Sequence, residues 1–397
     1  MVNFWADFKN KNKKIIGLSP MDGLTDYPFR KMVTKYGKPD VIYTEFVCVD
    51  NIFHAKKDLI SEFIYDESQR PIVAQIFGID PELFYISAQI FCELGFDGID
   101  INMGCPSKNV AQRGAGAGLI KNPQLAKEII ISTKKGIEDW VANGFCKDFP
   151  VRVQQKLEAT KTYLQKLGIK SNERKPIPVS VKTRIGYSEN EIDKWIPFLI
   201  EQNLACIALH GRTYKQMYHD KADWQAIAQA KKIIDKSSIA EKPILLGNGD
   251  IESLEQAQEY CEKYNIDGVL IGRAFLGRPW LLTPGLPQLK VTARQPQTEQ
   301  QQILSQTESP SQSQSKNVLP ESENLDEGLA LEKIFAIILE HSKLQEDFDG
   351  KNFFRVRKHL AWYCKGFRGA SELRKDLVLS NNFADVQRIL QNFLTKQ

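Results

Sequence analysis

The sequence predicts a (β/α)8 TIM barrel, an α/β fold, followed by a C-terminal all-helical domain. Eight short apolar runs recur along the chain, and a helical pattern follows each of them. Most runs are continuously apolar, as parallel strands covered on both faces should be. A polar residue ends nearly every run, which favours the barrel over the alternative, a doubly wound open sheet. The expected strands are residues 15–20, 41–47, 71–78, 98–104, 178–184, 206–212, 243–250 and 268–274.

Two interruptions divide this pattern into domains. The fourth and fifth expected strands lie about 70 residues apart, roughly twice what one crossover needs. We therefore expect an insertion at 143–175, with an extra helix at 154–168 whose function the sequence does not reveal. Residues 283–327 are rich in Gln, Ser, Thr and Pro, which predicts a disordered linker. The catalytic barrel would then occupy residues 1–282 and the helical domain residues 328–397.

Composition restricts the environment of the protein. The 397-residue chain has a net charge of only +4, so affinity for nucleic acid must come from a local basic patch. Its 7 cysteines are scattered and form no CxxC pair, which argues against a disulfide framework or zinc site and for a reducing compartment. The polar first 14 residues do not resemble a signal peptide, and no apolar stretch is long enough to span a membrane. We expect a cytoplasmic protein without membrane contact, and a monomer is the simplest assembly.

Polar and small residues at the ends of the expected strands should meet at one rim of the barrel. The most informative is the thiol of Cys105, which follows the fourth run between Gly104 and Pro106, two residues that fix a turn. The other rim residues are Pro20, Met21 and Asp22 after the first run, Gln75, Asn102, Lys182, Arg184, His210 and Arg212 in the middle runs, and Asn248, Gly249, Asp250, Gly272 and Arg273 in the last two.

This set of residues predicts a phosphorylated cofactor. Gly249 and Gly272 allow backbone N–H groups to approach an anion, and Arg273 supplies charge at the usual phosphate site of the fold. Lys182 and His210 donate hydrogen bonds, while the amides of the neighbouring strands donate or accept them. Such donors and acceptors suit a ring with carbonyls and ring nitrogens, such as an isoalloxazine.

Each rim residue also has a structural explanation when it is taken alone. Glycines are common in turns, and His210 could be a satisfied core histidine. Lys182 could form a structural salt bridge, Arg184 could form a surface ion pair, and Cys105 could be a small buried hydrophobic residue. The coincidence of these residues at so many strand ends favours a functional site.

Segments throughout the barrel resemble the tRNA-dihydrouridine synthases, flavin enzymes that reduce uridine in tRNA. The matching segments are SPMDGLTDYPFR (19–30), TEFV (44–47), QIFG (75–78), DINMGCPSK (100–108), VSVKTR (179–184), HGRT (210–213), GNGD (247–250) and IGR (271–273). Ser19 and Asp22 depart from the common pattern, at positions where backbone contacts are expected. The insertion at 143–175 and the linker at 283–327 are not typical of the family.

The resemblance implies a role for each rim residue except Arg212. It implies that FMN contacts Pro20, Met21, Asp22, Gln75, Lys182, His210, Asn248, Gly249, Asp250, Gly272 and Arg273. It places Asn102, Arg184 and Tyr218 against the uracil and makes Cys105 the proton donor.

The implied reaction is a reduction of the uracil 5,6 double bond. Hydride from reduced flavin to C6 leaves negative charge across C5 and the neighbouring carbonyl oxygen. A thiol with a pKa of about 8.5 is mostly protonated at neutral pH, so Cys105 can supply the proton to C5. Lys182, His210 or Arg184 could stabilise the developing charge. The resemblance assigns NADPH as the reductant, and because the sequence has no GxGxxG fingerprint in a βαβ context, we expect NADPH only to visit the flavin.

The C-terminal segment carries a basic stripe. On a helix, Lys351, Arg355, Lys358 and Trp362 would share one face. The opposite face would hold Phe353, Val356, Leu360 and Tyr363. The stripe could track phosphates, or it could be a solvated face with Trp362 under lysine stems. Residues 357–363, RKHLAWY, resemble the tRNA-binding domain of the family, so we expect Arg355, Arg357 and Lys358 to contact tRNA.

Three functions compete for this sequence. The first is an FMN-dependent reductase of tRNA uridines. The second is an FMN barrel oxidoreductase acting on a free small molecule, of the dihydroorotate or enoate type, which would leave the basic C-terminal helix without a role. The third is a catalytically inactive RNA-binding scaffold, and the intact Cys105, Lys182 and His210 count against it.

Overall fold

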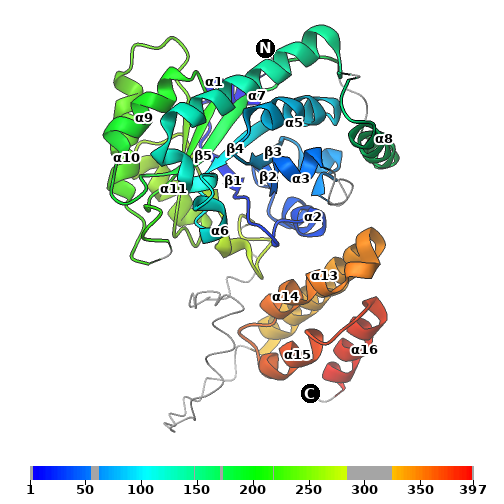
Figure 1. Cartoon of the computed structure of the whole chain (residues 1–397). Helices are drawn as coiled ribbons and strands as arrows, with labels where there is room; N and C mark the ends of the chain where they lie inside the picture. The colour runs from blue at the N-terminus through cyan, green and yellow to red at the C-terminus, as the bar shows by residue number, and fades with distance from the viewer. Residues whose placement is uncertain are drawn as a thin grey trace. The chain divides into compact units, whose positions relative to one another are not determined.

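The protein forms two compact units. The computed structural model describes residues 3–54, 62–146, 148–169, 173–217, 219–283 and 324–395. One unit lies within residues 1–283 and the other within 284–397, and Figure 1 shows the elements of each. Residues 284–323 of the predicted linker lie outside the described residues, so the disorder of 283–327 stays a prediction.

The first unit is a closed barrel of eight parallel strands. Consecutive strands pair in sequence order, and β8 pairs with β1, from Ile15 opposite Gly268 to Leu18 opposite Ile271. This closure confirms the predicted barrel and rules out the open sheet. The strands are β1 (Ile15–Leu18), β2 (Val41–Cys48), β3 (Ile72–Phe77), β4 (Gly98–Met103), β5 (Val179–Arg184), β6 (Cys206–His210), β7 (Ile244–Asn248) and β8 (Gly268–Ile271).

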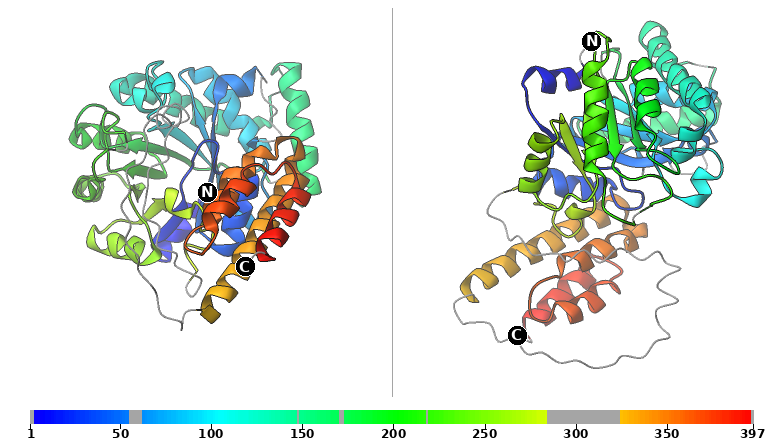
Figure 2. Two further views of the ribbon diagram at one scale, coloured as in Figure 1. Left: turned by 90° about the horizontal axis from the view of Figure 1, so that it is seen from below. Right: turned by 90° about the vertical axis from the view of Figure 1, so that its left-hand side faces the viewer.

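Helices surround these strands, as the views in Figure 2 show. They are α1 (Phe4–Asn10), α2 (Tyr27–Tyr36), α3 (Val49–Phe53), α5 (Pro81–Glu93), α6 (Lys108–Ala111), α7 (Pro123–Asn143), α8 (Val151–Lys166), α9 (Ile192–Glu201), α10 (Trp224–Lys236) and α11 (Leu254–Lys263). Short 3-10 turns are η1 (Glu67–Gln69), η2 (Gly116–Lys121) and η3 (Arg273–Phe275). None of the helices in the described part of the chain is long and apolar enough to cross a membrane.

Trp5 of α1 packs at the amino-terminal end of the barrel. Its side chain is buried in one cluster with Ile15 and Val41, which begin β1 and β2, and with Tyr43. This apolar packing closes the barrel where the strands begin. Chemistry in this fold is carried by the opposite end, where the strands finish.

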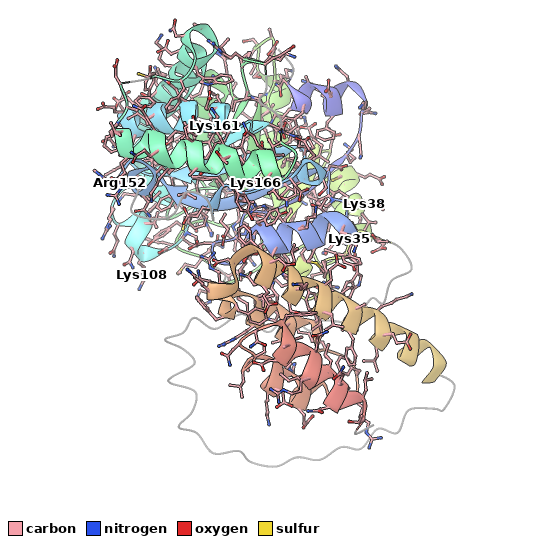
Figure 3. All side chains as sticks on the ribbon, turned by 90° about the vertical axis from the view of Figure 1, so that its right-hand side faces the viewer. Lys35, Lys38, Lys108, Arg152, Lys161 and Lys166 are labelled. Atoms are coloured by element: carbon pink, nitrogen blue, oxygen red, sulfur yellow. The ribbon has the colours of Figure 1, made fainter. Side chains whose placement is uncertain are left out.

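The predicted extra helix of the 143–175 insertion is α8. It begins three residues earlier than the expected 154–168, because Pro150 precedes its first turn. Val153, Leu157 and Leu164 form its buried face, at helical spacing. Figure 3 shows basic side chains along the same helix, those of Arg152, Lys161 and Lys166.

The second unit is all-helical in its described residues, as predicted. Its elements are α13 (Asn324–Asp349), η5 (Gly350–Asn352), α14 (Phe354–Tyr363), α15 (Ala370–Leu377) and α16 (Phe383–Leu394). The predicted apolar face is confirmed, because Phe353, Val356, Leu360 and Tyr363 are all buried. The predicted basic face is partly wrong, since Lys351 lies on η5, before α14 begins.

Candidate active site

Polar side chains on β3, β4 and β5 form a hydrogen-bonded relay inside the barrel. The fully buried carboxylate of Asp100 accepts hydrogen bonds from the Ser180 hydroxyl at 2.6 Å and from Nε2 of Gln75 at 2.7 Å. Oε1 of Gln75 accepts a hydrogen bond from Nδ2 of Asn102 at 3.0 Å. Because an ionised carboxylate can only accept, Asp100 fixes the orientation of both amides.

The loop that carries Cys105 is attached to this relay. Oδ1 of Asn102 accepts hydrogen bonds from the backbone N–H groups of Gly104 at 3.0 Å and Cys105 at 2.8 Å. Nε of Arg184 donates to the carbonyl of Gly104 at 2.7 Å. A Cβ atom at Gly116 would lie only 3.0 Å from Cβ of Cys105. The backbone that carries the Cys105 thiol is therefore fixed by contacts from several segments.

The environment of Cys105 keeps its thiol protonated. The residue is 8% exposed. Burial raises the pKa of the thiol above its usual 9.0, and the carboxylate of Asp22 adds to this effect, whereas the charges of Arg184 and Lys182 oppose it. At neutral pH the group is a thiol, able to donate a proton rather than to act as a nucleophile.

Nitrogen donors from β5 and β6 lie at the same end of the barrel. The strand register pairs Lys182 with Asn102 and Arg184 with His210. Nζ of Lys182 donates to Oδ1 of Asn248 at 3.1 Å. Burial, reinforced by the charge of Arg184, lowers the pKa of Lys182 to about 8, so it is still mostly charged at pH 7. Burial also lowers the pKa of His210 well below 6.5, so its ring is neutral.

Two of the structural alternatives are wrong. Within the described residues Lys182 has no ion-pair partner, so it is not held by a structural salt bridge. Arg184 is buried and donates to the backbone carbonyls of Gly104, Thr213 and Met217, so it is not a surface ion pair. Arg184 instead joins the loop after β6 to the Cys105 loop.

Charged residues after β6, β7 and β8 form the other side of the rim. Gly249 has a φ of +130°, and a Cβ atom there would lie 2.5 Å from Cβ of Ala222. The Asp250 carboxylate accepts hydrogen bonds from Nη2 of Arg212 at 2.6 Å and from Nη2 of Arg273 at 3.1 Å. Asp250 thus orients two guanidinium groups beside a backbone segment that admits no side chain.

The turn after β1 completes the rim. Sδ of Met21 lies 3.3 Å from the position that a Cβ atom at Gly272 would take. The N–H group of Met21 donates to the Thr25 hydroxyl at 3.0 Å, and its carbonyl accepts from the same hydroxyl at 3.1 Å. The expected backbone contact from Met21 therefore competes with hydrogen bonds of its own turn. Pro20 is half-buried, and Asp22 is exposed.

The structure describes only some of the residues that are expected to face the nucleic acid. Tyr218 lies outside the described residues. Arg355, Arg357 and Lys358 all lie on α14 and are half-buried. Arg357 donates to the carbonyl of Ser380 at 2.6 Å and to the side chain of Asn381, also at 2.6 Å. Its guanidinium thus connects α14 to the segment between α15 and α16, a structural role that the sequence did not reveal.

Sequence reasoning assigned no role to Asp100 or Arg212. Asp100 and Asn102 are two residues apart on β4, so their side chains lie on the same face of the strand. This spacing could have identified Asp100 from the sequence. The contact between Arg212 and Asp250 joins the segments that follow β6 and β7, and it could be recognised only once the fold was known.

Comparison with known proteins identifies the family of this chain. The family model described as "Dihydrouridine synthase (Dus)" matches this chain in two segments, residues 17–170 and 165–397. A "Probable tRNA-dihydrouridine synthase" of Staphylococcus aureus (strain COL) is 31% identical over 394 residues, which are 98% of this chain and 95% of the relative. A "Probable tRNA-dihydrouridine synthase 2" of Bacillus subtilis (strain 168) is 28% identical over 400 residues, covering 99% and 97%.

Similarity to solved structures is weaker. A 2-naphthoyl-CoA reductase in complex with 2-naphthoyl-CoA superposes with a TM-score of 0.43 and 9% identity, over 68% of this chain and 49% of that chain. The family assignment rests on the sequence matches, which span nearly the whole chain. The chain therefore belongs to the dihydrouridine synthase (Dus) family of oxidoreductases.

Proposed function

We propose that this protein reduces specific uridines of tRNA to 5,6-dihydrouridine, with FMN as its cofactor. Family membership and the names of the full-length relatives support this activity. The observation that carries the proposal is the buried, protonated thiol of Cys105, which lies at the same barrel end as Lys182 and Arg184. Together they offer a proton donor and positive charge to one substrate.

The rim residues fit FMN. Gly249 is packed so closely against Ala222 that a side chain there would not fit, and the 39% exposed side chain of Arg273, which follows Gly272, supplies positive charge for a phosphate. Lys182 and the neutral ring of His210 offer hydrogen bonds to a ring system. The residues proposed to hold the cofactor are Pro20, Met21, Asp22, Gln75, Lys182, His210, Asn248, Gly249, Asp250, Gly272 and Arg273. When bound, the flavin supplies the hydride that C6 of the uracil accepts.

The protein completes the reduction with a proton. After hydride addition at C6, the uracil carries negative charge across C5 and the adjacent carbonyl oxygen. Cys105 donates its thiol proton to C5, and the raised pKa keeps that proton available at neutral pH. Lys182 and Arg184 stabilise the negative charge, because their charges already act on the Cys105 thiol. Asn102 orients the donor by holding its backbone N–H group.

We propose NADPH as the reductant of the flavin. The glycine-rich segment 113–118 follows the Cys105 loop, but its glycines do not have GxGxxG spacing, and Gly116–Lys121 fold as η2 against that loop. Ala117 N–H donates to the Cys105 carbonyl at 3.4 Å. Because this segment is used in packing, NADPH is expected to react at the flavin without a separate dinucleotide domain.

Gly249→Ala is expected to weaken FMN binding about tenfold, because a Cβ atom at φ +130° is strained by about 1–3 kcal/mol and would contact Ala222. The matched control is Gly168→Ala, where φ is +87° and nothing lies within 4 Å of the added atom. Titration of the apo-protein with FMN, followed by the visible absorbance of the flavin, measures both variants. Unchanged affinity in Gly249→Ala would remove this residue from the cofactor site.

The basic side chains of α14 are proposed to bind tRNA phosphates. Replacing both Arg355 and Lys358 by Ala is expected to weaken tRNA binding several-fold. The slope of log affinity against log salt should fall by about one for each phosphate that is no longer neutralised. Arg357→Ala provides the contrast, because its hydrogen bonds to Ser380 and Asn381 predict a lower melting temperature of the C-terminal unit. An unaltered salt slope in the double variant would make this face a solvated surface.

The direct test of the proposed function is a comparison of tRNA from cells with and without this protein. Mapping of dihydrouridine should reveal at least one position that is lost with the protein and restored by the wild type but not by Cys105→Ala. An identical dihydrouridine map in both cells would contradict the proposal. Such a map would also identify the uridine that is reduced.

We further propose that the protein works as a monomer in the cytoplasm. All 7 cysteines are free thiols, which fits a reducing compartment. Size-exclusion chromatography should give a mass near 45.2 kDa, the mass of one chain.

A further inference from the structure

We propose that Tyr187 and Tyr214 form a stacking platform for a nucleobase that neighbours the target uridine. This inference rests on the proposed function and adds a binding site for the flanking RNA. Tyr187 follows β5 and Tyr214 follows β6, and both rings are half-exposed. Their centroids lie 4.5 Å apart with an interplanar angle of 20°, so the rings are stacked.

The platform is rigid because the two loops are fastened together. The N–H group of Tyr214 donates to the carbonyl of Gly186 at 3.0 Å, and that of Lys215 donates to the carbonyl of Tyr187, also at 3.0 Å. Nζ of Lys121 lies 4.9 Å from the centroid of the Tyr187 ring, within the range of a cation–π contact. Tyr187 is thus held between Lys121 and Tyr214, and the ring proposed to stack on the base is that of Tyr214. A rigid aromatic surface binds a base without first having to be ordered.

The platform lies beside the proposed proton donor. Arg184 donates one hydrogen bond to the carbonyl of Gly104, next to Cys105, and another to the carbonyl of Thr213, next to Tyr214. The segment that ends in Lys121 begins at Gly116, which packs against Cys105. Both sides of the platform therefore arise from segments that contact the Cys105 loop.

The position of Cys105 explains why a neighbouring base needs a binding surface. The thiol is buried, so a uracil must leave the RNA stack to reach it, and its departure removes a stacking partner from the next base. An aromatic ring at the rim replaces that partner, and this kind of stacking accepts any base because every base has a π face. Exposed lysines flank the rings, namely Lys121 and Lys108, and Figure 3 labels Lys108. Their charge suits the phosphates on either side of the displaced nucleotide.

A tyrosine elsewhere provides a matched control. The half-exposed Tyr264 stacks on Trp224 at 5.6 Å with an interplanar angle of 26°, and Nζ of Lys263 lies 5.6 Å from its ring centroid. It precedes β8, so its backbone lies at the amino-terminal end of the barrel. It has the same chemistry as the platform in a place where RNA is not expected.

The test is the affinity for fluorescently labelled tRNA, measured by anisotropy at fixed salt concentration. Tyr214→Leu is expected to raise the dissociation constant about tenfold, and Tyr187→Leu should also weaken binding because Tyr187 supports the Tyr214 ring. Tyr214→Phe keeps the ring face and should bind within about twofold of the wild type. Tyr264→Leu should bind like the wild type. Melting curves and FMN content of every variant show whether it is folded.

Leucine variants that are folded, retain FMN and bind tRNA as tightly as the wild type would overturn the platform. If a leucine variant does not fold, Lys121→Gln is the deciding variant. Because this side chain is exposed, its replacement should leave the fold intact, weaken tRNA binding and reduce the salt dependence of that binding. Failure of the proposed function is recognised separately. In that case flavin-loaded wild-type protein forms no dihydrouridine in tRNA, whatever the platform variants bind.

Discussion

Cys105→Ala is expected to lower the rate of dihydrouridine formation in tRNA by about 10²–10⁴-fold, the usual contribution of a positioned general acid. The substitution removes the acidic thiol proton of Cys105 and leaves the FMN-binding residues unchanged. Reduction of the flavin by NADPH should therefore proceed at the wild-type rate. Single-turnover mixing of pre-reduced enzyme with tRNA separates this step from the reaction with uridine.

The raised pKa of Cys105 gives this prediction a pH dependence. The acid form of the thiol is present below its pKa and is lost as the pH rises through that value, which lies above 9.0. Activity that depends on Cys105 should therefore persist across neutral pH and decline only in the alkaline range. Cys105→Ser, a much weaker acid, is expected to stay far below the wild type at every pH. Wild-type turnover in either variant would remove Cys105 as the proton donor.

Asp100→Ala is expected to lower the same rate about 100-fold, although Asp100 lies beneath the rim. Its carboxylate fixes the amide of Gln75, which fixes Asn102, which in turn holds the N–H group of Cys105. Without this acceptor the amides can reverse, and Asn102 would then present Nδ2 to backbone N–H groups that need an acceptor. Asp100 is thus a positioning residue for the proton donor.

Asp100→Asn is the matched variant, because its amide can still accept from Gln75 and donate to the Ser180 hydroxyl. It should retain much more activity than Asp100→Ala at pH 7. Burial raises the pKa of Asp100 to about 6, so the wild-type carboxylate takes up a proton as the pH falls through that value. The protonated carboxyl has the same donor and acceptor as the amide of Asp100→Asn, so below pH 6 the wild-type rate should fall only to that of Asp100→Asn, which itself has no acid limb there.

The alkylation rate of Cys105 provides a second measurement that does not depend on turnover. Mass spectrometry of the peptide that contains Cys105 gives the fraction alkylated by iodoacetamide at each pH. Asp100→Ala should shift this pH profile, because the thiol leaves its buried position, whereas Asp100→Asn should leave it near the wild type. An unchanged profile, together with an unchanged rate in folded Asp100→Ala, would show that the relay has no part in positioning.

The barrel could be predicted because its strands are apolar on both faces. Eight such runs with helical segments between them leave few alternatives, and the observed strands lie within one or two residues of each expected start. The expected ends are less accurate. The sixth and eighth runs extend past β6 and β8, because His210 and Ile271 are followed by turns that contain Gly. The rim residues were found for the same reason, since chemistry in this fold lies where parallel strands finish.

Partnerships between side chains could not be predicted in this way. Arg184 was expected to face the substrate, but it also holds three backbone carbonyls, and this depends on where two loops meet. Arg357 was expected to contact tRNA, which stays a prediction, and its guanidinium also connects α14 to the segment between α15 and α16. A charge pattern identifies a basic helix face, whereas the partner of each charge is decided by the packing of the helices around it. The stacked pair of Tyr187 and Tyr214 is of the same kind, because it joins loops of different strands.

The most direct test of the account is the reduction of a defined tRNA. Flavin-loaded protein is incubated with NADPH and an unmodified tRNA transcript, and in parallel with free uridine, and dihydrouridine is measured by mass spectrometry of the nucleosides. The account predicts dihydrouridine in the tRNA with wild-type protein, little in free uridine, and formation in the tRNA about 10²–10⁴-fold slower with Cys105→Ala. Turnover of free uridine at a rate comparable to that of tRNA, or no dihydrouridine in tRNA with the flavin-loaded wild type, would contradict it.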